Sequence, residues 1–513
     1  MSTHVPDLPV EILILIFSFV KHAKTLLNVA LSSKSYHEIV LPQLYSRVEL
    51  YAGWEEPFSE LRPLTCLLLS KPHVAKNVRQ LALREPYDEI LEDFVPPRSQ
   101  ADVEPEIRDA IAALAKDDEE KAQWMDDVSH DAHEDSVLSL MLPTLKNLTS
   151  LDLDFAMTPK YVCRQLGRVS EKERPFDQQM TLQNLESLLI GWIHPASRLR
   201  PEDIASIFLL PGLKYLYLHR FCSSTFWETA VEPLRSMTER SSPVTSIDMH
   251  DCNLSGSDII GTLKVCKALS SFCYEMAIDD ASNTGVDFPG LREALALHKE
   301  SLQDLWLDIG PEDPEWDDQV DNTTPMKSFA DFKALKRVKI ALVYLSGIFS
   351  ENEPENWANV LVEKLPPQIE HVQILRCQDG PEIVPKALEM LIVQKDGKFQ
   401  GLQRLVIEMP RAQVDQNEDT FRRLVELAKS NGIDFTILNN HGKANMTHRR
   451  QLVERKWGFD ENVEFLPCGS GRNVRPPFQL HKFQDEREDD DSEDDYSEDD
   501  DSEDDDISLT EVV

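Results

Sequence analysis

Positive charge is scarce in this sequence, and that scarcity argues against one large class of partner. The 513 residues include 53 Lys and Arg against 91 Asp and Glu, which gives a formal net charge of -38. Proteins that bind nucleic acids gather Lys and Arg into a patch or stripe that neutralises phosphates. The sequence contains no such stripe, so we expect no nucleic acid among its partners.

Long hydrophobic runs and paired cysteines are missing as well. The apolar run 12–20 is far shorter than the roughly 20 residues that a helix needs to span a bilayer. Asp7 and Glu11 precede most of this run where a secretory signal would carry positive charge, so we expect no membrane contact. The eight cysteines are scattered without a C-x-x-C pair, which indicates reduced thiols inside the cell, in the cytoplasm, the nucleus or both.

Catalytic signatures are also lacking. The sequence has no G-x-S-x-G, no phosphate-binding glycine loop and no protease motif. His130, His133 and Glu134 form an H-x-x-H-E cluster, whose order differs from the H-E-x-x-H of zinc proteases, and we favour a solvated helix face. We therefore expect no enzyme activity and no cofactor.

One further set of residues could bind zinc in principle, because its members fall on neighbouring repeats of the pattern described below. Core cysteines beside surface histidines explain the same residues more simply, so we expect no metal. The set consists of His219, Cys222, His250 and Cys252.

Most of the negative charge lies in two segments. Residues 485–506 have 17 acidic residues and one basic residue, and residues 84–135 have 18 acidic and five basic residues. The tail, 485–513, is too polar to bury a core, and we expect it to be disordered. We expect the insert, about 84–135, to loop off the body, partly disordered, with a helical stretch near 105–125.

The amino-terminal 46 residues predict three short helices, the second and third near 24–31 and 33–44. The first helix is apolar nearly all round, and a unit of this size cannot bury every face of it. Something else must cover the remainder. Two sets of residues make up the pattern: Leu8, Ile12, Leu15, Ile16 and Phe19 on one side, with Leu13, Ile14, Phe17 and Val20 over most of the rest.

The stretches LPVEILILIFSFV and LLNVALSSKSYHEIVLPQLY resemble the F-box. That family has Leu-Pro-x-Glu-Ile-Leu with a following Ile-Phe, then a Leu/Val-rich second helix and a third helix ending in Leu-Tyr. The resemblance implies a module over residues 1–46 that docks on a Skp-type adaptor, which bridges to a cullin. The alternative is a helical cap packed on the next domain. The contact residues that the resemblance implies are Leu8, Pro9, Ile12, Leu13, Ile16, Phe17 and Val20.

A pattern of apolar-x-x-apolar-x-apolar recurs ten times between Val78 and Ile407, and a last strand is expected near 432–438. From Leu153 onward, equivalent positions are 25 to 37 residues apart. Such a period indicates a repeat architecture. Alternation predicts a strand in each unit, and the gaps leave room for a returning helix. This predicts an α/β solenoid with a parallel sheet. The alternative is an open α/β sheet of separate units.

The unit at 244–254, VTSIDMHDCNL, looks like a leucine-rich repeat, L-x-x-L-x-L-x-x-N/C-x-L, with Cys252 at the Asn/Cys position. Cys377 stands at the same place in a later unit. The resemblance implies that this residue turns inward and hydrogen-bonds neighbouring backbone. We expect a leucine-rich-repeat-like solenoid over 47–438, followed by a cap or extension over 439–484.

Residues that alternate with the core positions should lie on the inner face of the array. Tyr and Trp beside charged residues are typical of protein-binding surfaces. We expect them to be exposed and to contact a substrate protein that the sequence does not identify. These residues are Tyr215, Tyr217, Asp248, Trp306 and Asp308.

The acidic tail repeats the motif SEDD three times. Acidic residues directly after serine suit an acidophilic kinase, so Ser492, Ser497 and Ser502 are candidate phosphorylation sites. The tail could equally be a solubilising segment, a contact for a basic partner such as a histone, or a contact with basic patches on the ligase machinery.

The two resemblances together imply a non-catalytic substrate-recognition subunit of a Skp–cullin–F-box ubiquitin ligase. In that reading the amino-terminal module binds the adaptor and the repeats bind the substrate. The alternative is a ubiquitin-independent repeat scaffold or acidic chaperone that holds basic proteins.

Overall fold

The fold comes from a computed structural model of the full chain. Ser492, Ser497, Ser502, His130, His133 and Cys222 lie outside the residues that the structure describes, as do the tail and nearly all of 440–484. The described residues are 8–20, 22–51, 60–84, 103–129, 134–155, 159–177, 181–192, 204–219, 221, 237–276, 287–309, 325–346, 359–375, 377, 383–409, 411–439 and 464–465.

The amino-terminal unit has the three helices that the sequence predicts. They are α1 (Val10–Ser18), α2 (Ala23–Ser32) and α3 (Lys34–Leu44). The side chain of Ser33 accepts a hydrogen bond from the Tyr36 N–H at 3.1 Å and so caps the start of α3.

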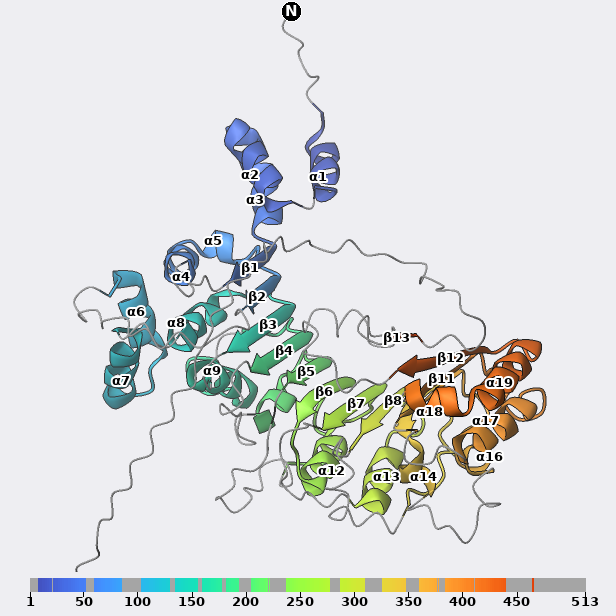
Figure 1. The fold of residues 1–513 in the computed structure, drawn as a ribbon. Coiled ribbons are helices and arrows are strands. Elements are labelled where there is room, and N and C mark those ends of the chain that lie inside the picture. Colours follow the sequence, from blue (N-terminus) through green and yellow to red (C-terminus); the bar gives the residue numbers. More distant parts are fainter. Residues whose placement is uncertain are drawn as a thin grey trace, which may run out of the picture. The chain divides into compact units, whose positions relative to one another are not determined.

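One sheet runs through the rest of the described chain, and its strands lie side by side in sequence order from β1 to β13 (Figure 1). All neighbours pair in parallel except β12 and β13. The order never reverses, which confirms the solenoid and excludes the open-sheet alternative. The strands are β1 (Arg47–Tyr51), β2 (Gln80–Arg84), β3 (Ser150–Phe155), β4 (Ser187–Trp192), β5 (Tyr215–His219), β6 (Ser246–Cys252), β7 (Ser271–Met276), β8 (Asp304–Asp308), β9 (Arg337–Ala341), β10 (His371–Leu375), β11 (Arg404–Glu408), β12 (Asp434–Asn439) and β13 (Glu464–Phe465).

Helices of varied length return the chain between strands, and Figure 1 shows them along one side of the sheet. Side chains of these helices and of the strands form one continuous hydrophobic core. The helices are α4 (Leu61–Ser70), α5 (Pro72–Ala75), α6 (Pro105–Leu114), α7 (Asp118–Ser129), α8 (Glu134–Met141), α9 (Lys160–Glu171), α12 (Gly256–Val265), α13 (Phe288–Ala296), α14 (Leu342–Ser346), α16 (Val360–Lys364), α17 (Ile383–Val393), α18 (Arg411–Gln416) and α19 (Glu418–Ser430), with 3-10 turns at Leu142–Thr144 and Ile207–Leu209.

The apolar pattern sets the register of the strands. Leu81 pairs with Leu151, and Leu83 pairs with Leu153, so the second and third apolar positions align across the sheet. The same alignment holds for every predicted unit up to Ile407. These side chains are buried, because in a strand every second residue faces the same side.

The residue before each strand joins neighbouring repeats. The Arg79 carbonyl accepts backbone N–H groups from Thr149 at 2.7 Å and from Ser150 at 3.1 Å. Carbonyls from Ser46 to Glu370 repeat this double acceptance, one in each successive repeat. Each repeat therefore gains its lateral backbone bonds only from its neighbours, as expected for a solenoid.

The first strand, β1, is one that the sequence analysis missed. Val48 pairs with Leu81 and Leu50 pairs with Leu83, so Tyr45, Val48 and Leu50 carry the repeat pattern. Tyr45 also directly follows α3, and the partly buried Leu41 and Tyr45 pack against the core of the array. The end of the helical unit thus serves as the start of the first repeat.

The implied role of the repeat cysteines is confirmed. The Cys252 thiol is buried, lies 3.2 Å from the His250 carbonyl oxygen and accepts a hydrogen bond from the Phe221 N–H at 3.4 Å. The Cys377 thiol is likewise buried and lies 3.5 Å from the Ile374 carbonyl oxygen.

The described part of the acidic insert packs on the array, which corrects the expectation that it loops off. Its helical stretch exists as α6 and α7, separated by a short break. Ile107, Ile111 and Trp124 are all fully buried in the main core. Ile107, Ile111 and Leu114 form the buried apolar side of α6, although the segment as a whole carries a high net negative charge.

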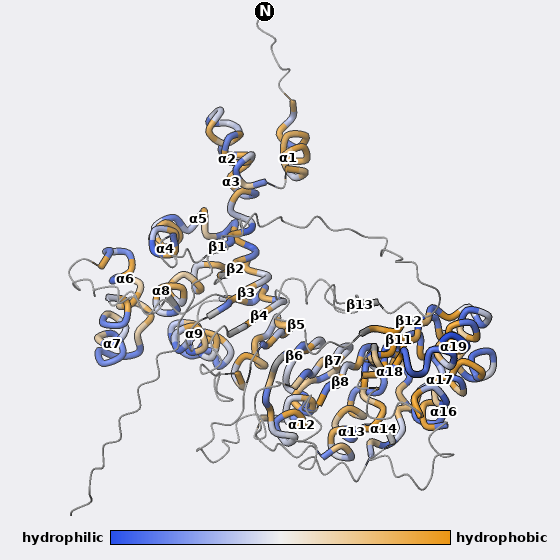
Figure 2. Tube along the Cα trace, in the orientation of Figure 1, coloured by the Kyte–Doolittle hydropathy of each residue, from blue (hydrophilic) through white to orange (hydrophobic). Residues whose placement is uncertain are grey.

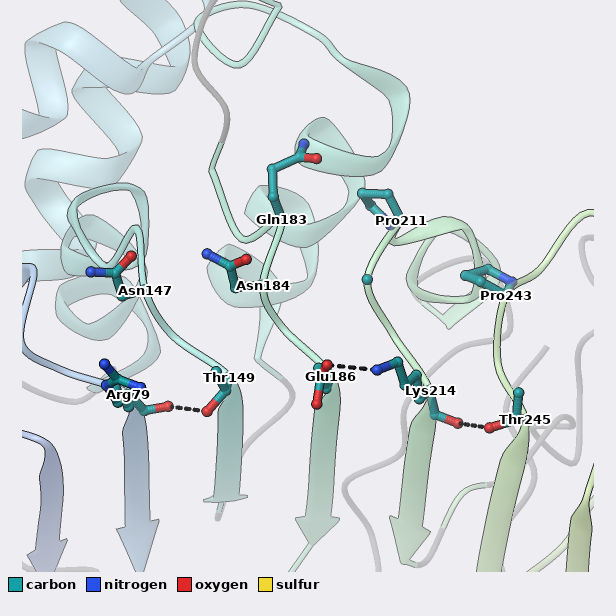
Figure 3. A pocket seen from close by; sticks show the side chains of 11 residues that line it. Arg79, Asn147, Thr149, Gln183, Asn184, Glu186, Pro211, Lys214, Pro243 and Thr245 are labelled. Carbon is teal, nitrogen blue, oxygen red and sulfur yellow. Dashed lines mark hydrogen bonds and ion pairs between the residues drawn. The ribbon is translucent and has the colours of Figure 1, made fainter.

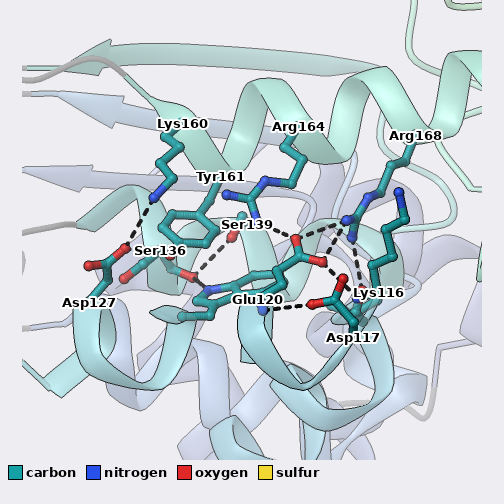
Figure 4. A network of polar contacts seen from close by, with 12 residues as sticks. Lys116, Asp117, Glu120, Asp127, Ser136, Ser139, Lys160, Tyr161, Arg164 and Arg168 are labelled. Atoms are coloured by element: carbon teal, nitrogen blue, oxygen red, sulfur yellow. Dashed lines mark hydrogen bonds and ion pairs between the residues drawn. The ribbon is translucent and has the colours of Figure 1, made fainter. Parts of the chain in front are cut away.

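Paired charges let this acidic segment approach the array (Figure 4). Glu120 of α7 accepts hydrogen bonds from Arg168 of α9 at 2.7 and 2.9 Å and also from Arg164. Arg168 donates to the Leu114 carbonyl as well, at 2.9 Å. Burial alone would raise the pKa of the Glu120 carboxyl, but hydrogen bonds from Arg168, the Lys116 backbone N–H and Arg164 hold that pKa below 4.5.

Aromatic and backbone contacts complete the attachment of the insert. The Trp124 ring stacks on Tyr161 of α9 with centroids 4.8 Å apart, and its indole N–H donates to the Ser136 carbonyl at 2.9 Å. Arg62 of α4 donates to the Val128 carbonyl at 2.9 Å. Helices α6 and α7 are therefore fixed from two sides by the helices of the array.

Within the described ranges, no helix has the length and hydropathy needed to cross a membrane.

Candidate functional site

The inward side of α1 builds the core of the amino-terminal unit. Phe17 is buried with Leu26, Ala30 and Val40, and Leu13 and Val20 of α1 are partly buried against this cluster.

Two interactions fix the orientation of α1 against α3. The Gln43 side chain donates to the carbonyls of Phe17 at 2.5 Å and of Val20 at 3.3 Å. The Tyr36 ring meets the Phe17 ring edge-on, with centroids 5.7 Å apart. Since these contacts hold the inward side of α1 on the unit, its opposite side points to solvent.

The outward side of α1 is apolar and exposed. Phe19 is 75% exposed, Leu15 54% and Ile16 45%, whereas core residues of the array are mostly below 5%. Figure 2 shows α1 as a strongly hydrophobic helix. We call the stripe at helical spacing the α1 apolar face; it consists of Leu8, Ile12, Leu15, Ile16 and Phe19.

The same three-helix unit has other exposed apolar residues. Val10 and Ile14 form a second strip on α1, and Leu27 and Leu31 are exposed on α2. In the rest of the described chain, the exposed large hydrophobic residues are only Leu209, Leu297 and Val393, far apart in sequence. A contiguous exposed apolar patch usually marks a protein interface, so this unit is the strongest candidate for one.

The seven contact residues predicted for this unit divide into two groups. Phe17, Leu13 and Val20 point into the unit's own core, so their direct role in the free chain is structural. The other four are exposed and available to a partner; they are Leu8, Pro9, Ile12 and Ile16.

A second candidate surface is the inner face of the sheet, which we define as the face opposite the helices. Neighbouring strands pair their polar side chains across it. The Tyr215 hydroxyl donates to Asp248 at 2.8 Å, and Arg337 makes two hydrogen bonds with Asp304 at 2.5 and 2.6 Å. These pairs run across the strands and tie adjacent repeats together.

The structure corrects the expected exposure of two inner-face residues. Tyr217 is 1% exposed and Asp248 is 3% exposed, whereas Tyr215, Trp306 and Asp308 are half-buried. The Tyr217 ring stacks on His250 of the next strand with centroids 5.5 Å apart. The alternation of residues identifies the inner face, but it does not reveal how closely neighbouring side chains pack over one another.

Charge on the inner face concentrates around Trp306. The Lys339 ammonium lies 3.6 Å from the Trp306 ring centroid and 3.6 Å from the Glu408 carboxylate. Burial raises the pKa of Glu408, the carboxylates of Asp308 and Glu275 raise it further, and Lys339 opposes them. The Lys339 ammonium group therefore lies close to both the Trp306 ring and the Glu408 carboxylate.

His371 lies at the amino-terminal end of β10, near several cationic side chains. Burial lowers its pKa to about 4, and the nearby Arg404, Arg337 and Lys339 lower it as well. The imidazole is therefore neutral at physiological pH.

An open groove of about 610 Å³ runs across the starts of β2 to β6 (Figure 3). Its polar groups already bind one another: Lys214 pairs with Glu186 at 2.6 Å, and Asn147 donates to the Lys76 carbonyl at 2.7 Å. A Cβ on Gly212 would clash with the loop before β4, so the loops themselves are tightly nested. We assign the groove a structural role in joining repeats.

Three of the four residues weighed for zinc, His219, His250 and Cys252, lie within the described ranges. Within the described ranges, no group of three or more His, Cys, Asp or Glu side chains could hold a metal ion. His250 Nδ1 lies 2.7 Å from the Glu275 carboxylate, and the Cys252 thiol hydrogen-bonds to the backbone carbonyl of His250.

Comparison with known proteins agrees with this architecture. A family model described as a leucine-rich repeat domain matches residues 58–417, and a model described as F-box-like matches residues 5–51. These matches confirm both resemblances. No curated protein matches the chain.

Proposed function

The chain belongs to the leucine-rich repeat domain family and begins with an F-box-like domain, and from this we propose that it is the substrate-recognition subunit of a Skp–cullin–F-box ubiquitin ligase. F-box domains generally bind Skp-type adaptors. In our proposal the amino-terminal unit binds the adaptor, the adaptor recruits a cullin, and the repeats bind the substrate protein.

The exposed α1 apolar face carries this proposal. Burying five large apolar side chains of this kind would contribute several kcal/mol, since each side chain contributes roughly 1.5–3 kcal/mol when fully buried. A three-helix unit whose own core contains only four buried residues among those described gains no stability from exposing such a face. A protein partner of apolar surface would cover it.

The mechanism is proximity rather than chemistry on this chain. A subunit that binds a ligase core at one end and a substrate along its repeats raises the local concentration of each near the other. Ubiquitin transfer is then performed by a separate enzyme, and the chain needs no catalytic residues of its own.

Reconstitution tests the proposal. The purified full chain is mixed with a Skp-type adaptor, a cullin–RING core, a ubiquitin-conjugating enzyme and ubiquitin, and ubiquitin transfer to lysines of the chain is followed. We expect a stable complex and transfer that require the α1 apolar face. A chain that neither co-elutes with the adaptor nor accepts ubiquitin would refute the proposal.

The second candidate is a ubiquitin-independent scaffold or chaperone for basic proteins, which the charge of 485–506 favours. The two functions differ in which end of the chain matters. Removal of 485–513 would abolish partner binding by a chaperone, whereas removal of the F-box-like unit would abolish recruitment to a ligase.

A further inference from the structure

A small group of cations lies at one end of the open groove that crosses the strand starts. Lys76 and Arg79 lie in the loop before β2, and Lys146 lies in the loop before β3. The two loops are in contact, because the Asn147 side chain donates to the Lys76 carbonyl and the Thr149 N–H donates to the Arg79 carbonyl, each at 2.7 Å. We call Lys76, Arg79 and Lys146 the basic patch.

The three side chains of the basic patch are exposed and uncompensated. Although acidic residues outnumber basic ones by 91 to 53, no carboxylate of the described chain lies within ion-pair distance of any of the three. Other exposed cations on the same edge of the sheet do meet a carboxylate: Lys214 pairs with Glu186 at 2.6 Å, and Lys336 pairs with Glu370 at 2.9 Å. The charge of the basic patch is therefore available to a partner.

The groove gives an extended peptide room beside the basic patch. Arg79 lines its β2 end, next to Asn147 and Thr149 (Figure 3). From β2 to β6 the groove crosses four strand spacings, or roughly 19 Å, which is the length of about six residues of extended chain. The exposed Gln183 amide on its rim has no hydrogen-bond partner among the described residues and could bind a peptide backbone.

We propose that the basic patch and the adjoining groove bind an acidic segment of a substrate protein in extended form, with its carboxylates at the patch. This inference rests on the proposed function and names the class of substrate segment that the chain would recognise.

Charge complementarity carries the choice of an acidic peptide, because the patch would repel a basic segment. A nucleic acid fits the same surface less well. Three cations neutralise few phosphates, and the described residues that line the groove include no aromatic ring on which a base could stack.

Peptide titration tests this inference. Fluorescent peptides of one length are made in three matched sets, with Glu, Gln or Lys at the same fixed positions, and are titrated into the full chain with and without a Skp-type adaptor. The test variant is Lys76→Gln with Arg79→Gln and Lys146→Gln. We expect only the Glu set to bind the native chain, and the test variant to weaken that binding about tenfold, since each exposed charge contributes modestly.

Charge reversal gives a second variant with an opposite readout. Lys76→Glu with Arg79→Glu and Lys146→Glu should lose binding of the Glu set and gain binding of the Lys set. All three positions are exposed, so thermal denaturation of this variant should match that of the native chain.

A matched control removes the same charge elsewhere. Lys121→Gln with Lys386→Gln and Lys429→Gln neutralises three exposed cations on α7, α17 and α19. None of the three forms an ion pair with another described residue, as in the basic patch. This control should leave binding of the Glu set within about twofold of the native chain.

Four results would overturn the inference. Two of them are binding without preference for the Glu set, and equal loss in the test and control variants. The third is binding of the Glu set that appears only after removal of residues 485–513, which would make the chain's own acidic tail the occupant. The fourth is tighter binding of a single-stranded oligonucleotide of equal charge, which would make the patch a general polyanion site.

Adaptor binding measured on the same samples separates the two proposals. Peptide binding as predicted without adaptor binding would remove the ligase function and leave this site. Adaptor binding without acidic-peptide binding would do the reverse.

Discussion

The F-box-like unit and the acidic insert reverse the usual relation between hydropathy and burial. Helix α1 is among the most apolar segments of the chain, yet Phe19 is 75% exposed. Helix α7 carries three acidic residues in its first turn, yet its Trp124 is fully buried and its Glu120 is largely enclosed. Composition would have placed these two helices the other way round.

The two helices differ in the contacts that the rest of the chain offers to their side chains. Glu120 meets Arg168 and Arg164, so its charge is compensated and its apolar neighbours can pack. The α1 apolar face meets no such surface among the described residues of its unit, because the small core is filled by the opposite side of the helix. A helix whose charged and apolar groups are paired within the chain has a structural role. A helix with an exposed apolar face that nothing in its unit covers indicates a binding partner.

The largest effect should come from placing charge on the α1 apolar face. Ile12→Asp with Ile16→Asp should weaken binding of the Skp-type adaptor on the order of 100-fold or more, since carboxylates would be desolvated in an apolar interface. Unfolding of the chain should change little, because both side chains are exposed. Calorimetric titration and thermal denaturation measure the two quantities.

The control for this variant uses exposed apolar residues outside the unit. Leu297→Asp with Val393→Asp introduces the same charges at positions that are 39% and 56% exposed. Adaptor affinity should be unchanged. An equal loss in this control would mean that general charge repulsion, and not the α1 apolar face, governs the binding.

The second-largest effect should come from breaking the ion pair between Arg168 and Glu120, which attaches the insert to the array. Arg168→Met leaves Glu120 with Arg164 and the Lys116 backbone N–H as donors, and it removes the donor to the Leu114 carbonyl. We expect the opening of residues 105–129 to become easier by about 3 kcal/mol, because a buried carboxylate loses a buried partner. Amide hydrogen exchange of α6 and α7 measures this free energy.

Arg422→Met is the matched control for that substitution. Arg422 pairs with Glu418 and Asp419 on the exposed surface of α19. Its loss should change stability by no more than about 0.5 kcal/mol. Similar destabilisation by both variants would show that burial of the Glu120–Arg168 pair does not increase its contribution to stability.

The same pair predicts a dependence on acidity. The pKa of Glu120 is lower in the folded chain than in the unfolded chain, so its stabilisation is complete above about pH 4.5 and is lost as the pH falls through the folded value. The effect should be smaller than that of Arg168→Met, because a protonated carboxyl still packs in place. Hydrogen exchange of α7 in a pH series, compared with Glu120→Gln, measures it; an identical pH response in that variant would exclude Glu120 as the cause.

The smallest effect should come from a polar contact that is neither enclosed nor charged. Asn147→Ala removes the exposed hydrogen bond to the Lys76 carbonyl between two loops of the array. The loss should be about 0.5–1 kcal/mol, typical of one neutral hydrogen bond. Chemical denaturation measures it, and a loss as large as that of Arg168→Met would contradict the ranking by enclosure.

Much of the array follows from the sequence, because the strand pattern is local. The spacing of apolar residues placed ten strands and their register, and each aligned pair such as Leu81 and Leu151 needed only the period of a strand. Strand β1 escaped notice because Tyr45 lies at the end of a helix and at the start of a repeat. The pattern itself was present in Tyr45, Val48 and Leu50.

The features that could not be predicted depend on contacts between distant segments. Arg168 and Glu120 are 48 residues apart, and nothing local shows that they meet. The burial of Tyr217 depends on the side chain of His250 in the next repeat. The outward side of α1, by contrast, followed from the number of apolar residues in a unit too small to hide them.

Amide hydrogen exchange of the full chain, with and without an equimolar Skp-type adaptor, tests the central claim most directly. We predict that the adaptor protects α1 and α2 and leaves α6 and α7 unchanged, since of these four helices α1 and α2 have exposed large apolar residues in the described chain. Protection confined to α6 and α7, or no protection of α1, would contradict it.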